Sequence, residues 1–316
     1  MPTCFSSNKI KKDYSFNWIK MRYDIKENYL KIHLIKTTYK TLLGRPADSD
    51  GLKNYLNAIA NKSLAESAEF LNSSLMHSDE FIAFTKSRMS SDKFSYTPQA
   101  LTESAPDDSM HVKHIVSLGS HCLTSWTLKK FNLKKISLPF DWLFSCPAMI
   151  IDCLRDDFTS FLDKNEYSSL RRQSREPGAH HNKYKEKYRL NDIFTHRDPN
   201  TPADYEYYVR AVKRFRNILK SKEGKLFVIC CREEIDIAKQ LPELVTELSH
   251  HTTNFYLLAF ALQKPAYLQL ERISSGENYS LYSLTPESEE RFTGKFSSLT
   301  DEMVIISKVL SFNLEL

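Results

Sequence analysis

The pattern of hydrophobic and polar positions changes character near residue 110. Before it, apolar side chains recur at intervals of three and four residues, which is the spacing of amphipathic helices. After it, short apolar runs alternate with helical stretches, which is typical of a layered α/β domain. Residues 88–110 between these regions are rich in serine, proline and acidic side chains. We therefore predict an all-α domain over 1–90, a linker over 91–111 and an α/β domain over 112–316.

The N-terminal region carries clear helix boundaries. Gly44, followed closely by Pro46, is predicted to end one helix, and Asp48 to start the next. Ser63, with Glu66 three residues later, forms the capping box of a third helix. Asp48 and its acidic neighbours lack the remaining oxygen ligands of an EF-hand, so helix capping explains them better than calcium binding.

Four apolar runs in the second region predict strands, at 114–118, 226–231, 254–261 and, more weakly, 279–283. Amphipathic stretches at 203–220 and 234–249 predict helices that feed the strands after them. This alternation favours a helix-flanked, largely parallel sheet, which places ligand sites at the carboxyl ends of strands. Residues 164–200 are polar with little periodicity, and we expect a long loop there that acts as a lid or a binding loop.

Composition narrows the function classes. The 44 basic and 39 acidic residues describe a mixed, solvated surface, so no nucleic-acid partner is expected. No apolar stretch is long enough for a membrane span, and the N-terminus lacks the apolar core of a secretory signal. The six cysteines form no CxxC pair, so neither a metal site nor a cofactor is predicted. We expect a soluble, cytoplasmic and reduced protein.

Cys122 is the leading candidate for chemistry. It follows a predicted strand and a turn at Gly119, and it stands where a helix begins. The positive end of the helix dipole favours a thiolate, so we expect a lowered pKa at this position. The alternative is a buried thiol that only packs, as free cysteines often do.

A cysteine nucleophile needs a base and a group that orients the base. The candidate bases are His121, His180, His181 and His196. His196 ends a short apolar approach and is a plausible strand-end histidine, whereas His121 is expected to point away from the thiol. Asp141 or Asp198 could orient the base, although Asp141 could instead cap a helix over 142–154.

A second kind of site is compatible with the same residues. Ser117 and Ser120, together with Arg210, Arg214 and Arg232, could bind an anionic group such as a sugar nucleotide or a phosphorylated glycan. Cys122 would then be structural. The chain has no GxGxxG, P-loop or GxSxG motif that would specify a nucleotide site or a serine nucleophile.

The N-terminal region resembles a known module. The string YKTLLGRPADSDGL at 39–52, Tyr55 and the string SDEF at 78–81 are similar to a small helical module of uncharacterised function. That module is attached to bacterial glycosyltransferases and cell-envelope proteins. The resemblance implies a bacterial setting near surface-glycan biosynthesis, and a protein partner is possible through this module.

The second region resembles another family. The strings SLGSHC at 117–122, PFDW at 139–142 and LFVI at 226–229, with His196 and the Arg210/Arg214 pair, are similar to bacterial proteins described as papain-like cysteine peptidases. The resemblance spans about 112–260. It implies Cys122 as nucleophile, His196 as base and, as an alternative fold, a papain-like α+β domain. A papain-like fold carries its histidine on an antiparallel sheet, which the helix-alternating pattern does not predict.

The sequence thus leads to three hypotheses. The first is a cysteine-dependent hydrolase or acyl-transfer enzyme with a peptide, acyl or glycan substrate. It would use Cys122, His196 and Asp141 or Asp198, and backbone N–H groups from Gly119 to Cys122, including that of His121, would bind the substrate oxyanion. The second is a glycan-pathway transferase or glycan-binding protein. The third is a non-catalytic module recruited through residues 1–90.

Overall fold

The structure, a computed structural model, describes residues 27–28, 30–81, 83, 110–170, 177–291 and 294–315. The chain divides into two compact units, Met1–Ser91 and Asp92–Leu316, and each is described by itself. Most of the predicted linker, residues 92–109, lies outside the described residues. Among the helices that are described, none has both the length and the apolar character required to cross a membrane.

The first unit contains the predicted helices. One helix covers 30–43, and it is followed by α2 (Ser49–Ala58) and α3 (Leu64–Met76). The Asp48 side chain accepts a hydrogen bond from the N–H of Gly51, which caps α2. Ser63 and Glu66 form both hydrogen bonds of the capping box at the start of α3. The capping interpretation of these residues is therefore confirmed.

The second unit is built on a six-stranded sheet with the order β10-β1-β4-β5-β7-β6. The strands are β1 (His111–Ser117), β4 (Gly224–Cys231), β5 (Phe255–Leu262), β6 (Gln269–Gly276), β7 (Tyr279–Thr285) and β10 (Asn313–Leu314). All neighbours pair in parallel except β6, which runs antiparallel to β7 at one edge. The predicted largely parallel sheet is confirmed, and the papain-like alternative is not the arrangement of this sheet.

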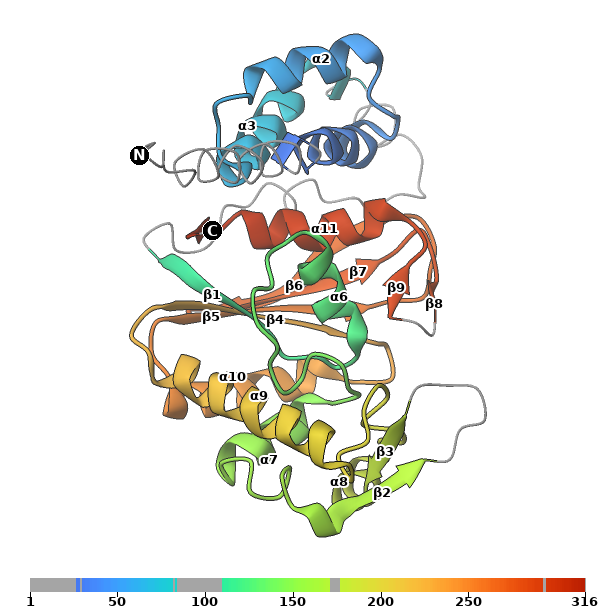
Figure 1. The fold of residues 1–316 in the computed structure, drawn as a ribbon. Coiled ribbons are helices and arrows are strands. Elements are labelled where there is room, and N and C mark those ends of the chain that lie inside the picture. Colours follow the sequence, from blue (N-terminus) through green and yellow to red (C-terminus); the bar gives the residue numbers. More distant parts are fainter. Residues whose placement is uncertain are drawn as a thin grey trace, which may run out of the picture. The chain divides into compact units, whose positions relative to one another are not determined.

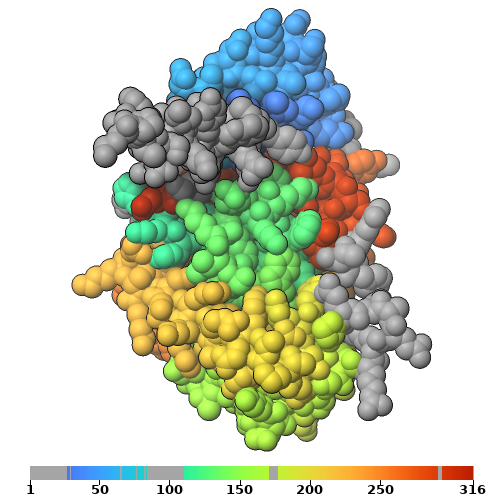
Figure 2. All heavy atoms as spheres, in the orientation of Figure 1, coloured from blue at the N-terminus to red at the C-terminus, as the bar shows by residue number. Residues whose placement is uncertain are grey.

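Helices cover both faces of the sheet (Figure 1). One face carries α7 (Pro147–Arg155), α9 (Pro202–Lys220) and α10 (Ile237–His251), and the other carries α6 (Cys122–Lys130) and α11 (Leu299–Leu310). Every residue of β4 is buried, as expected for a central strand of a parallel sheet covered on both sides. The space-filling view shows the green segment near residues 120–150 between the yellow segment of α9 and the red C-terminal segment (Figure 2).

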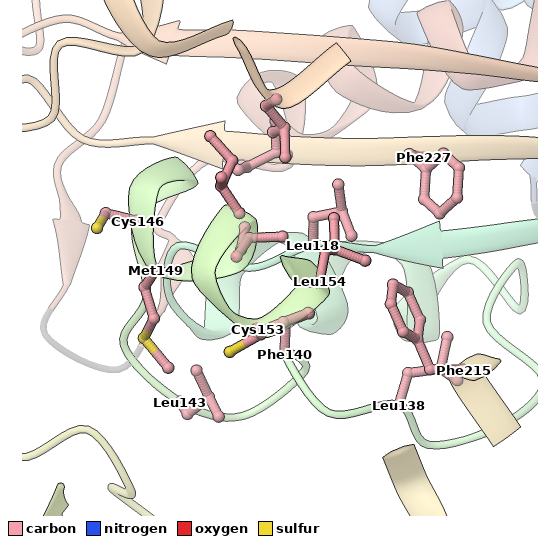
Figure 3. Packing of buried hydrophobic residues seen from close by; sticks show 14 of the residues in the cluster. Leu118, Leu138, Phe140, Leu143, Cys146, Met149, Cys153, Leu154, Phe215 and Phe227 are labelled. Atoms are coloured by element: carbon pink, nitrogen blue, oxygen red, sulfur yellow. The ribbon is translucent and has the colours of Figure 1, made fainter. Parts of the chain in front are cut away.

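Aromatic side chains form the centre of the core between the sheet and the helices α7, α9 and α10. Phe140 is fully buried, and its ring lies 5.8 Å from those of Phe158 and Phe215. Figure 3 shows Phe140 and Phe215 on the same side of the sheet as Phe227 of β4, among Leu118, Leu154 and Cys153. The rings of Phe140 and Phe215 pack edge to face, and such aromatic pairs add to the free energy of burial.

Residues 164–200 differ from the predicted long loop. The described part contains the 3₁₀ turn η1 (Lys164–Glu166), the hairpin of β2 (Tyr167–Leu170) and β3 (Gly178–His181), and helix α8 (Asn182–Tyr188). These short elements lack sequence periodicity because they are held by isolated contacts of Tyr167, Ala179 and Tyr184 with the core. Strand β6, helix α11 and the hairpin of β8 (Glu290–Arg291) and β9 (Lys295–Phe296) were not predicted either.

The aromatic core generates a stability prediction. Phe140→Ala leaves a cavity among rings that cannot close it, so we expect a loss of about 3–5 kcal/mol in the free energy of unfolding. Ile136→Ala, at a side chain that is 43% exposed, should change it by no more than about 0.5 kcal/mol. Urea unfolding followed by circular dichroism measures both, and equal effects would contradict the packing argument.

Candidate functional site

The strand, turn and helix around Cys122 have the predicted form. Strand β1 ends at Ser117, and Cys122 is the first residue of α6. Gly119, between them, has a φ of +88°, and a Cβ at this position would lie 2.6 Å from the Ser145 hydroxyl and 3.0 Å from the Phe140 carbonyl oxygen. Glycine is the residue that combines this backbone conformation with so close an approach.

The thiol of Cys122 meets the imidazole of His196. The distance between Sγ and Nε2 is 3.3 Å, although the two residues are 74 positions apart in the sequence. The other candidate bases have different surroundings. The Nδ1 atom of His180 accepts a hydrogen bond from the N–H of Asp192 at 3.0 Å, and Nε2 of His181 lies 2.9 Å from the Ser160 carbonyl oxygen.

Backbone pairing places His196. Phe194 forms antiparallel bridges with Leu143 and with Ala179, so the segment before His196 is held between two others. The Trp142 ring then packs edge to face against the imidazole, with centroids 6.4 Å apart and planes at 88°. The PFDW string therefore contributes a core residue, Phe140, and a ring that limits the orientation of His196.

Asp141 lies in a buried ion pair. Its Oδ2 atom is 2.6 Å from Lys134 Nζ and accepts the N–H of Leu138, while its Oδ1 accepts the Ser125 hydroxyl at 2.8 Å. Burial raises the pKa of this carboxyl group, and these three partners oppose the rise. Among the described residues, its contacts thus join the loop after α6 to α6 itself and do not reach His196.

Asp141 as a helix cap and Asp198 as the group that orients the base are the other interpretations of the two aspartates. The helix near residue 142 is α7, which starts at Pro147 with Cys146 as N-cap, so Asp141 does not cap it. Asp198 lies in the turn before α9, where its Oδ1 accepts the N–H of Asn200 and its own N–H donates to Asp204. Neither aspartate is seen orienting His196 in the described part of the protein.

A charged cluster that the sequence did not reveal lies beside the thiol. Arg232, directly after β4, donates from Nε and Nη2 to the two carboxylate oxygens of Glu290 at 2.9 and 3.0 Å. His121 Nε2 lies 2.8 Å from Glu290 Oε2. The β8–β9 hairpin that carries Glu290 also packs on Cys122, since a Cβ on Gly294 would come within 2.7 Å of the Cys122 Cβ. Two-residue strands leave no periodic signal that could have predicted this arrangement.

The resting thiol is protonated near neutral pH. Burial raises the pKa of Cys122 to about 11, and Glu290 adds to the rise. The Thr195 hydroxyl and the Arg232 guanidinium act in the opposite direction but do not offset the burial. The lowered pKa expected from the helix start is therefore wrong for this structure, because loss of hydration at the sulfur outweighs the helix dipole.

The candidate substrate-binding residues separate into two groups. The hydroxyls of Ser117 and Ser120 are buried and already hydrogen-bonded within the protein. The Ser117 hydroxyl accepts the N–H of Gly119, and the Ser120 hydroxyl donates to the carbonyl oxygen of Cys230. On α9, the exposed Arg214 donates to the Ser137 carbonyl oxygen at 3.4 Å, and Arg210 is exposed. Arg232 is the one predicted arginine that contacts the cluster around Cys122 in the described part of the chain.

Comparison with known proteins adds one finding. A family model described as "Putative papain-like cysteine peptidase (DUF1796)" matches residues 113–261, a stretch that runs from β1 to β5 and includes Cys122 and His196. No curated protein and no solved structure matches the chain. Glu290 lies outside the matched residues. The similarity of residues 39–81 to a helical module remains a prediction.

The ion pair of Asp141 generates the next prediction. Asp141→Asn leaves Lys134, a largely buried cation, without its counter-ion, so unfolding free energy should fall by about 3 kcal/mol. Asp157→Asn, which breaks an exposed pair with Arg216, should cost less than about 1 kcal/mol. Urea unfolding measures both changes.

The same Asp141→Asn variant tests whether this carboxylate orients the base. The pH dependence of Cys122 alkylation by iodoacetamide should keep its midpoint, because Asp141 does not contact the thiol–imidazole pair. A shifted midpoint in folded Asp141→Asn would instead assign Asp141 to that pair.

Proposed function

We propose that the domain predicted over 112–316 is a cysteine-dependent hydrolase or acyl-transfer enzyme acting on peptide or acyl substrates. Cys122 is the nucleophile and His196 is the general base. The observation that carries this proposal is the 3.3 Å contact between the Cys122 sulfur and Nε2 of His196. A nucleophile and a base within hydrogen-bond reach are the minimal requirement of such catalysis. The match of residues 113–261 to a family described as peptidases supports the same chemistry.

The raised pKa of the thiol determines how the first step proceeds. Because Cys122 is protonated at rest, its proton passes to Nε2 of His196 as the sulfur attacks the substrate carbonyl carbon. The carbon–sulfur bond forms while the carbonyl oxygen takes up negative charge. His196 then gives the proton to the leaving amine or alkoxide, and a thioester remains on Cys122.

The second step releases the acyl group. His196 removes a proton from water or another acceptor, which attacks the thioester, and the Cys122 sulfur leaves with the proton. The first N–H groups of α6, from Cys122 onward, have no partner within the helix and are suited to hold the oxyanion in both steps. Trp142 is a positioning residue, since it limits rotation of the imidazole through its edge-to-face contact.

The alternative of a glycan-pathway transferase or glycan-binding protein has less support. It required the hydroxyls of Ser117 and Ser120 as ligands, and both are already used within the buried turn. A role in surface-glycan metabolism and a protein partner for residues 1–90 remain predictions based on sequence resemblance. A cytoplasmic location remains a prediction from the sequence composition.

A panel of peptide amides, esters and thioesters tests the proposal. Turnover should be abolished in Cys122→Ser and should fall by about 10²–10⁴-fold in His196→Ala, because the base is lost while the fold is kept. His180→Ala is the matched control, since this histidine contacts Asp192 and should leave turnover unchanged. Turnover by Cys122→Ser equal to that of the wild type would exclude Cys122 as the nucleophile.

A further inference from the structure

The carboxylate of Glu290 contacts a guanidinium and an imidazole beside a thiol that stays protonated. Its two oxygens face Arg232 Nε and Nη2, and one of them also lies 2.8 Å from His121 Nε2. Only 10% of the Glu290 side chain is exposed, and only 2% of that of His121, so water screens these contacts weakly. A cation next to a cysteine ordinarily favours its thiolate.

We propose that Glu290 is a positioning residue that binds Arg232 and so withholds its positive charge from the sulfur of Cys122. This inference deepens the proposed function, because it assigns the charge balance of the same site. It also separates Glu290 from the usual role of a third catalytic residue, since the carboxylate contacts Arg232 and His121 and has no contact with His196 among the described residues.

The arrangement of elements supports this role. Arg232 follows the carboxyl end of β4, and His121 is the N-cap of α6, so both partners of Glu290 lie next to elements that position Cys122. Glu290 arrives from the β8–β9 hairpin, whose Gly294 packs against the Cys122 Cβ. The same hairpin thus packs against the Cβ of Cys122 and supplies the carboxylate that neutralises Arg232.

The charged groups near the thiol shift the pKa of Cys122 in opposite directions. Glu290 raises the pKa of Cys122, whereas Arg232 lowers it. Burial lowers the pKa of His121 despite the opposing effect of Glu290, so Arg232 is the cation whose charge Glu290 offsets. Glu234, after β4, adds a further negative charge near Arg232 and His121, and His196 accepts the thiol proton.

Glu290→Gln tests the inference, because it removes the charge and keeps an oxygen that can accept from Arg232. The midpoint of Cys122 alkylation against pH should fall by about one unit, which makes labelling near pH 7 about tenfold faster. Iodoacetamide is the probe, labelling is measured on the peptide that contains Cys122, and Cys122→Ser gives the background. An unchanged or higher midpoint in folded Glu290→Gln overturns the proposal.

Three further variants complete the test. Arg232→Gln should raise the midpoint, and Arg232→Gln with Glu290→Gln should bring it back near the wild-type value. Glu223→Gln is the matched control, since Glu223 contacts Lys113 and His114 before β4 begins and should cause no shift. If Glu290→Gln fails to fold, an unchanged or lowered midpoint in Arg232→Gln still overturns the inference.

Labelling and turnover report on different claims. Alkylation of Cys122 requires no substrate, so the midpoint shift tests the charge balance alone. A shift in a protein that turns over no ester, thioester or peptide would contradict the proposed enzyme and leave the inference standing. Turnover with no shift in Glu290→Gln would contradict the inference and leave the enzyme standing.

Discussion

The position of His196 depends on the backbone of Phe194, which pairs with Leu143 on one side and Ala179 on the other. These two bridges join three segments that are separate in the sequence, and the N–H of Phe144 adds a hydrogen bond to the Ile193 carbonyl oxygen at 2.9 Å. Phe194 itself is fully buried in the aromatic core. The parallel sheet fixes Cys122 independently, through β1 and the turn at Gly119. Any displacement of the aromatic core would therefore move the imidazole of His196 away from Cys122.

Burial determines the chemistry available at the thiol. The helix start favours a thiolate, but the sulfur is half-buried, and the cost of removing a charge from water is the larger effect. Arg232, the cation that could offset this cost, is bound by Glu290. A protonated thiol at rest fits a mechanism in which proton transfer accompanies attack, and it also limits the reaction of Cys122 with other electrophiles.

Several residues that look catalytic in the sequence have structural roles. Asp141 forms a buried ion pair with Lys134, which holds the loop between α6 and the PFDW string. The hydroxyls of Ser117 and Ser120 complete the hydrogen bonding of the turn before Cys122. In a buried turn, polar groups must find partners within the protein, so polar side chains next to a nucleophile need not contact substrate.

The sequence by itself determined the local elements: the capped helices of the first unit, the apolar strands β1, β4, β5 and β7, and the start of a helix at Cys122. These depend on neighbouring residues, and their periodicity is visible in one segment of chain. It also identified His196 as one candidate among four histidines. Only the tertiary structure decided which of them meets the thiol, that Asp141 turns toward Lys134, and that Glu290 neutralises Arg232. The contacts of His196 and Glu290 join segments far apart in the chain, and no local pattern records which partner a side chain finds when the sheet forms.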